Sequence, residues 1–161
     1  MPTVSRQRVI RAPVEAVWSV VSDPYHLPRW WPRVSRVENV QGEGGRRARW
    51  TAVLGTETGR GVRADYRCVS AAENERYLWE QDLADTPFER ILKAARTEVR
   101  LRPSDGSTEV VLEIRQALRG LSRLGSPWMR RATGRTLSEA LEGLERALGD
   151  SRESPAAEAP A

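Results

Sequence analysis

The clearest pattern in the sequence is an apolar stripe near its C-terminal end. Leu137, Leu141, Leu144 and Leu148 recur at spacings of four, three and four residues, which is one face of an α-helix. Charged residues fill the opposite face of this helix: Arg130, Arg131, Arg135, Glu139, Glu142, Glu145 and Arg146. The pattern predicts a helix over residues 127–148 that lies with its leucines on another layer of the protein.

The middle of the chain has a different period. Apolar side chains recur there at every second position, and charged side chains occupy the positions between them, which is typical of strands in a sheet covered on one face. Pro103-Ser104-Asp105-Gly106 is a strong hairpin signal. The predicted strands are residues 3–11, 34–40, 46–54, 60–70, 77–83, 96–102 and 109–117.

Two short helices are predicted between the first two strands. Pro13 is suited to the first turn of a helix over residues 13–21, which Asp23-Pro24 ends. Residues 25–31 form a second short helix closed by Pro32. Adjacent residues on a helix point about 100° apart, so one of the pair Trp30 and Trp31 should pack inward and the other should lie nearer a cavity rim.

Residues 85–95 leave two interpretations open. The segment around Phe88 fits a helical turn, and it also fits the start of a long, bulged strand. The length of the hairpin partner favours the strand. The resulting order is a strand, two short helices, about six strands and a long helix, which predicts an α+β protein. A long helix across an antiparallel sheet can enclose a cavity.

Length and composition set the domain organisation. The chain has 161 residues, the length of a single domain. We expect that domain to comprise residues 1–149, and we expect residues 150–161, rich in Ser, Pro, Ala and Glu, to be a disordered tail. No apolar run approaches the roughly 18 residues of a membrane span, and the start lacks the apolar region of a secretory signal. We therefore expect a cytoplasmic protein without stable membrane insertion.

Charge and ligand-forming residues exclude several functions. The net charge is +4, but all of the 26 basic residues except Lys93 are arginines, and 22 acidic residues are interleaved with them, so we do not expect nucleic-acid binding. His26 is the only histidine, and Cys68 is the only cysteine. A metal cluster is therefore not expected, and no cofactor motif is present. His26 fits a surface position better than an acid–base role, and Cys68 fits a core position better than a nucleophile.

The acidic residues of the strands do not predict catalysis. By alternation they share the charged face with arginines, so we expect solvated cross-strand pairs and no buried carboxylate. The acidic residues considered are Asp65, Glu80, Asp82, Glu98 and Glu113. No catalytic residue can be named from this pattern.

Polar side chains on the apolar face of the sheet carry the functional prediction. A buried glutamine or tyrosine without a partner costs roughly 1–3 kcal/mol, so their presence there favours a cavity with water or a ligand over a plain core. The candidate ligand-binding residues are, on the sheet, Trp50, Tyr66, Trp79, Gln81, Thr97 and Gln116 and, on the last helix, Trp128, Met129 and Thr133.

Three segments resemble a known family. They are residues 8–24 (RVIRAPVEAVWSVVSDP), 27–32 (LPRWWP) and 127–131 (PWMRR) followed by the leucine stripe. This sequence resembles the START-related SRPBCC superfamily, and most closely its bacterial polyketide cyclase/dehydrase-like branch, over residues 3 to about 148. The resemblance implies the helix-grip fold, in which a curved antiparallel sheet of about seven strands wraps a long C-terminal helix.

The residues and this resemblance together lead us to expect a function without a metal or cofactor. We expect the protein to bind a hydrophobic small molecule, either a lipid or an aromatic, polyketide-like compound, between the sheet and the last helix. The alternative is a cyclase/dehydrase-like enzyme that acts on a poly-carbonyl or aromatic substrate. A third possibility is a protein partner, unidentified by the sequence, bound through the outer sheet or the helix pair. The absence of a catalytic constellation makes us favour binding over catalysis.

Overall fold

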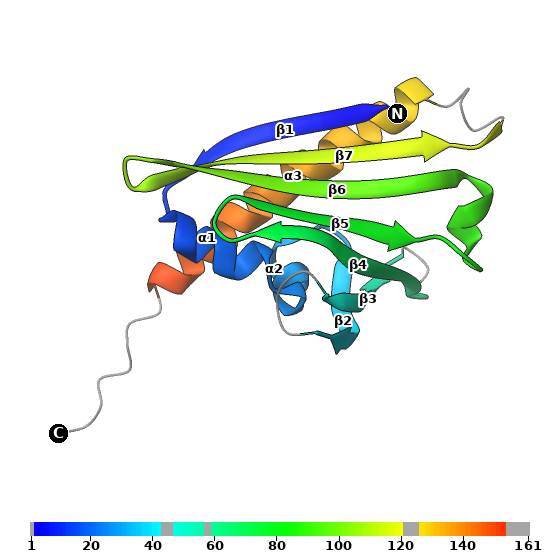
Figure 1. Cartoon of the computed structure of the whole chain (residues 1–161), viewed down its shortest axis with the longest axis horizontal. Coiled ribbons are helices and arrows are strands. Elements are labelled where there is room, and N and C mark those ends of the chain that lie inside the picture. Colours follow the sequence, from blue (N-terminus) through cyan, green and yellow to red (C-terminus); the bar gives the residue numbers. More distant parts are fainter. Residues whose placement is uncertain (1, 43–46, 57–58, 121–125, 154–161) are drawn as a thin grey trace.

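The structure is a computed structural model that describes residues 2–42, 47–56, 59–120 and 126–153. A curved antiparallel sheet forms one layer, and its strand order is β1-β7-β6-β5-β4-β3-β2 (Figure 1). The long helix α3 crosses one face of this sheet. The strands are β1 (Thr3–Ile10), β2 (Val34–Gln41), β3 (Arg49–Leu54), β4 (Val62–Ala72), β5 (Arg76–Asp82), β6 (Leu92–Ser104) and β7 (Ser107–Leu118).

The helices occupy the predicted places with different limits. Two short helical segments follow α1 (Val14–Val21), namely η1 (Pro24–His26) and α2 (Leu27–Trp30). The last helix, α3, runs from Ser126 to Glu153, so residues 150–153 belong to the helix and not to the tail that was predicted there. The rest of that predicted tail, residues 154–161, lies outside the described residues. The α+β helix-grip architecture is confirmed.

The segment with two interpretations contains both structures. A helical turn, η2, spans Pro87–Arg90, so the preference for a strand was wrong at these residues. The strand β6 begins at Leu92 and has a register irregularity before Ala94, as expected of a bulged strand. The β6–β7 hairpin turns at Asp105 and Gly106, both with positive φ, which explains the strong turn signal in the sequence.

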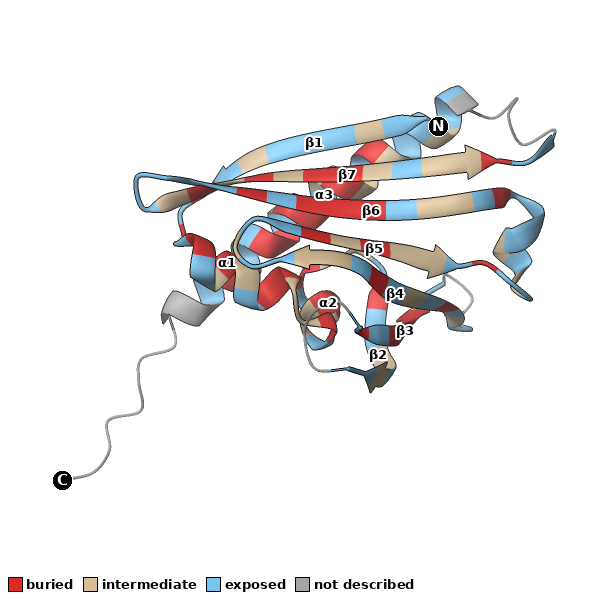
Figure 2. Ribbon diagram, in the orientation of Figure 1, coloured by how far each residue is buried: buried red, intermediate tan, exposed pale blue. Residues whose placement is uncertain are grey.

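The leucine stripe of α3 forms the centre of the core. Leu137 and Leu144 are completely buried, and Leu141 is 2% exposed. Figure 2 shows the buried residues gathered along α3 and on the strands that it crosses. At Gly143 the backbone of α2 approaches α3 so closely that a Cβ atom there would overlap the carbonyl group of Trp30. The glycine thus fixes how tightly α2 packs against the last helix.

The outer face of the sheet differs from the prediction at two residues. Glu98 and Glu113 are each 7% exposed, so they are buried carboxylates and not solvated ones. They lie directly opposite each other on β6 and β7. Arg115 donates to Glu113 at 2.7 Å, and Arg100 donates to the same carboxylate at 3.3 Å. The long arginine side chains lie over the carboxylates and remove them from water while neutralising their charge.

Candidate functional site

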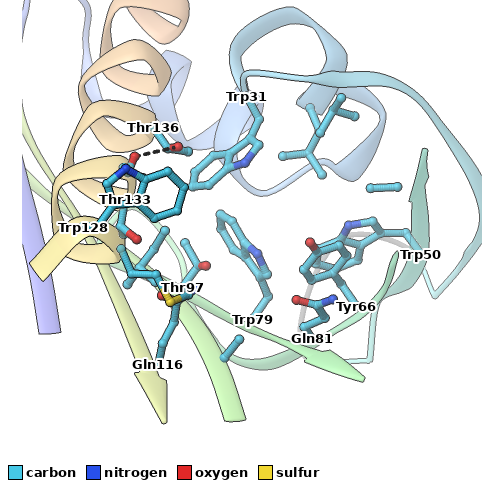
Figure 3. Close-up of a pocket in the computed structure, with 17 residues that line it drawn as sticks. Trp31, Trp50, Tyr66, Trp79, Gln81, Thr97, Gln116, Trp128, Thr133 and Thr136 are labelled. Atoms are coloured by element: carbon cyan, nitrogen blue, oxygen red, sulfur yellow. Dashed lines mark hydrogen bonds between the residues drawn. The ribbon is translucent and has the colours of Figure 1, made fainter. Parts of the chain in front are cut away.

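A cavity of about 300 Å³ lies between the concave face of the sheet and the first half of α3 (Figure 3). The residues that form its wall come from α2 and the residue after it, from β2–β7 and from α3. They are Leu27, Trp31, Val34, Trp50, Ala52, Tyr66, Trp79, Gln81, Ala95, Thr97, Ile114, Gln116, Trp128, Met129, Ala132, Thr133 and Thr136. The leucines that follow on α3 are buried in the core and do not belong to the wall.

All nine candidate residues named from the sequence lie in the wall of this cavity. Trp50 and Trp79 are almost fully buried, whereas Trp128 is 75% exposed. A side chain that lines the cavity and also faces solvent stands at an opening, so Trp128 marks a place where the cavity meets the surface. Whether these residues bind a ligand stays a prediction.

The register of the sheet arranges the wall in rows. Trp50 on β3 is opposite Tyr66 on β4, and Tyr66 is opposite Gln81 on β5. Farther along, Ala95 on β6 is opposite Gln116 on β7. Side chains opposite each other in a sheet point to the same face, so one row presents these residues together to the cavity.

Trp79 is the centre of an aromatic cluster. Its ring lies 5.7 Å from the ring of Trp31, 6.2 Å from that of Trp50 and 6.5 Å from that of Trp30, all edge to face. The ring of Tyr66 stacks on Trp50 at 5.9 Å. Such contacts between aromatic rings contribute about 0.5–1.5 kcal/mol each beyond the buried area, so this wall of the cavity is firmly held.

The polar side chains of the wall are available for a ligand. Within the described part of the chain, the side chains of Tyr66, Gln81, Thr97, Gln116 and Thr133 make no hydrogen bond to the protein. The hydroxyl of Thr136, by contrast, donates to the carbonyl oxygen of Ala132 at 3.1 Å. The cavity therefore offers neutral donors and acceptors that the fold itself does not use.

The described wall of the cavity carries no charged side chain. Its only titratable group among these residues is the phenol of Tyr66, and burial raises the pKa of Tyr66 to about 12. The phenol is thus neutral at any ordinary pH. The described wall is therefore electrically neutral.

Sequence reasoning did not name the other wall residues as site residues. Ala52 lies two positions from Trp50, and Ile114 lies two positions from Gln116. The two-residue period of the strands therefore places them on the same face as the candidate residues and could have identified them. Ala132 and Thr136 follow Met129 and Thr133 by three residues and could have been found by the helical period. Leu27 and Val34 come from α2 and β2, and no local pattern indicates them.

Trp30, the last residue of α2, and Trp31, which follows it, point in different directions, as expected. Trp30 is 2% exposed and belongs to the core, and Trp31 lines the cavity. The lone histidine and cysteine do not line it. His26 is near Asp23 and Arg29 at the surface, and burial raises the pKa of the Cys68 thiol.

The described residues lack the defining features of two other classes of protein. No cluster of three or more His, Cys, Asp or Glu side chains in this part of the chain is arranged to hold a metal ion. None of its helices combines the length and the apolar character that crossing a membrane requires.

Comparisons with solved structures identify the same architecture. A protein of Thermus thermophilus is 21% identical with a TM-score of 0.74, and the match covers 93% of this chain and 99% of that one. A START superfamily protein from Mycobacterium smegmatis is 16% identical with a TM-score of 0.73, covering 92% and 98%. The di-domain ARO/CYC StfQ from the steffimycin biosynthetic pathway is 11% identical with a TM-score of 0.73, covering 93% of this chain and 52% of that one.

The curved seven-stranded sheet, the long C-terminal helix across it and the cavity between them define a helix-grip protein. Residues 1–149 match the family described as "Polyketide cyclase / dehydrase and lipid transport", and the chain belongs to this family. No curated protein matches the sequence. The predicted resemblance is confirmed.

Proposed function

We propose that this protein binds a hydrophobic small molecule, a lipid or an aromatic, polyketide-like compound, in the cavity between the sheet and α3. The observation that supports this most is the composition of the wall: an aromatic cluster together with five neutral polar side chains that have no partner in the described protein. Aromatic surface supplies the contact area for such a ligand, and a few fixed polar groups set its orientation.

The unused hydrogen-bonding groups of the wall support the binding of a ligand with polar groups of its own. A polar group removed from water without a new partner costs about 1–3 kcal/mol. Gln81 and Gln116 each carry an amide with several donor and acceptor sites that only water or a ligand can satisfy. Both side chains line the cavity and are partly exposed to it, so a ligand that enters can take the hydrogen bonds that water makes there.

A cyclase/dehydrase-like enzyme is the second candidate. The family description names that activity, and StfQ is an ARO/CYC protein. Burial keeps the phenol of Tyr66 protonated, and Gln81 is directly opposite it, so the pair could donate hydrogen bonds to a substrate carbonyl. A general base would also be needed, and the described wall offers no group that titrates near neutral pH. Binding is therefore the function that we favour.

Filling the cavity should prevent binding. Ala95→Phe places a ring between Gln81 and Gln116, and we expect it to weaken the binding of Nile red, a neutral hydrophobic dye, by at least about tenfold. The measurement is the saturable increase in dye fluorescence during titration of the protein. The matched control is Ala72→Phe, which adds the same ring at the exposed end of β4. Equal dye binding by the two variants would contradict the proposed site.

A further inference from the structure

The unpaired polar side chains of the cavity form two separate sets. Tyr66 and Gln81, opposite each other on β4 and β5, form the first set. Thr97 on β6 and Gln116 on β7 form the second, and Thr133 of α3 lies on the same side. Figure 3 shows the ring of Trp79 between the two sets. The cavity thus has two polar ends and an aromatic middle.

The register gives the distance between the two ends. Glu80 is opposite Arg96, which places Gln81 beside Ala95, and Ala95 is opposite Gln116. The two glutamines therefore stand two strands apart, with a strand between them. Neighbouring strands are separated by about 4.8 Å, so the glutamine backbones lie roughly 10 Å apart. The residue between them is an alanine, whose methyl group leaves the space over the middle strand open.

The absence of charged side chains from the described wall limits the charge that a ligand can carry. An anion or cation that enters this cavity loses its hydration, and the described wall offers no opposite charge to compensate. Neutral hydrogen-bonding groups, such as hydroxyls and carbonyls, match the amides and hydroxyls that are present. An aliphatic chain with one charged end would leave one polar end unused and would bury its charge.

From these three observations we propose that the cavity selects an uncharged, elongated ligand with a flat apolar middle and a hydrogen-bonding group at each end. One end binds Tyr66 and Gln81, and the other binds Thr97 and Gln116. The flat middle lies over Ala95 and against the ring of Trp79. This inference rests on the proposed function and specifies the ligand class for the same cavity.

The test uses four probes with one ring system: naphthalene, a naphthol, a naphthalene diol with hydroxyls at opposite ends, and the corresponding dicarboxylate. Isothermal titration calorimetry of the full chain gives each affinity. We expect the diol to bind most tightly, followed by the naphthol and naphthalene, with the dicarboxylate weakest. Each hydrogen bond contributes about 0.5–1.5 kcal/mol, which corresponds to about 2- to 12-fold in affinity.

Two variants test the two polar ends of the cavity one at a time. Gln81→Met and Gln116→Met each remove one amide and retain a side chain of similar length. We expect each to weaken diol binding by about 2- to 12-fold and to leave naphthalene binding unchanged. The naphthol should be less sensitive to either variant, because it can reverse its direction and use the remaining amide. The matched control is Gln7→Met on the exposed surface of β1, which should alter no affinity.

The outcomes distinguish this inference from the proposed function. If naphthalene and the diol bind equally well, or if neither glutamine variant affects binding of the diol, the inference of a ligand with a polar group at each end is wrong. The proposed hydrophobic binding site would still be supported, because naphthalene binds. A dicarboxylate that binds more tightly than the diol would overturn the requirement for an uncharged ligand. If neither Nile red nor any uncharged probe binds, the proposed function fails together with the inference.

Discussion

Replacing Leu141 with alanine is expected to lower the free energy of unfolding by about 2–5 kcal/mol. Leu141 is 2% exposed, and it lies between Leu137 and Leu144, which are completely buried. The truncation removes apolar contacts and leaves a void that the long helix cannot close by moving, because its neighbours on the same stripe hold it to the sheet. Urea unfolding followed by circular dichroism measures the change.

The neighbouring position provides the control. Glu142 is exposed on the other face of α3, and Glu142→Ala should change the free energy of unfolding by less than about 0.5 kcal/mol. A loss at Leu141 below about 0.5 kcal/mol would mean that the stripe does not pack as the structure describes. Leu141 is not in the wall of the cavity, so Nile red should bind the folded Leu141→Ala variant as tightly as the parent.

Local periodicity was sufficient to assign residues to faces. In a strand the side chains alternate between two faces, so the positions of Trp50, Tyr66 and Gln116 relative to their charged neighbours already determined which face they share. The helical period did the same for Met129 and Thr133. No knowledge of the other elements was needed, and the structure places all of these residues around one cavity.

Contacts between distant elements could not be read in this way. Leu27 reaches the cavity wall because α2 packs against α3, and that approach depends on Gly143, more than a hundred residues away. Val34 reaches the wall through the pairing of β2 with β3. The sequence predicted that Trp30 and Trp31 would point in different directions. Which of them faces the cavity is decided by the same packing.

The buried carboxylates illustrate a second limit. Alternation correctly placed Glu98 and Glu113 on the charged face of the sheet. Their burial depends on which arginines lie beside them on neighbouring strands, and it depends on the length of those side chains. Strand order and register determine these neighbours, and neither property is contained in the pattern of a single strand.

Gly143→Ala should reverse the usual effect of replacing a helical glycine. Alanine normally stabilises a helix relative to glycine by about 1 kcal/mol. Here the added Cβ would overlap the carbonyl oxygen of Trp30 and would lie 3.0 Å from its carbonyl carbon, and a backbone group cannot rotate away as a side chain can. We expect a net loss of about 1–3 kcal/mol in urea unfolding. Because α2 would be displaced, Leu27 and Trp31 should move, and Nile red binding should weaken.

Gly134→Ala on the same helix is the matched control. A Cβ at Gly134 would meet the guanidinium end of Arg6, a long side chain on exposed β1 that can change its rotamer at little cost. We therefore expect this variant to be stabilised by up to about 1 kcal/mol, with unchanged dye binding. If the two alanine variants are stabilised equally, α2 does not pack against α3 as closely as the structure shows. The opposite signs expected at these two glycines would show that the close approach at Gly143 positions one wall of the cavity.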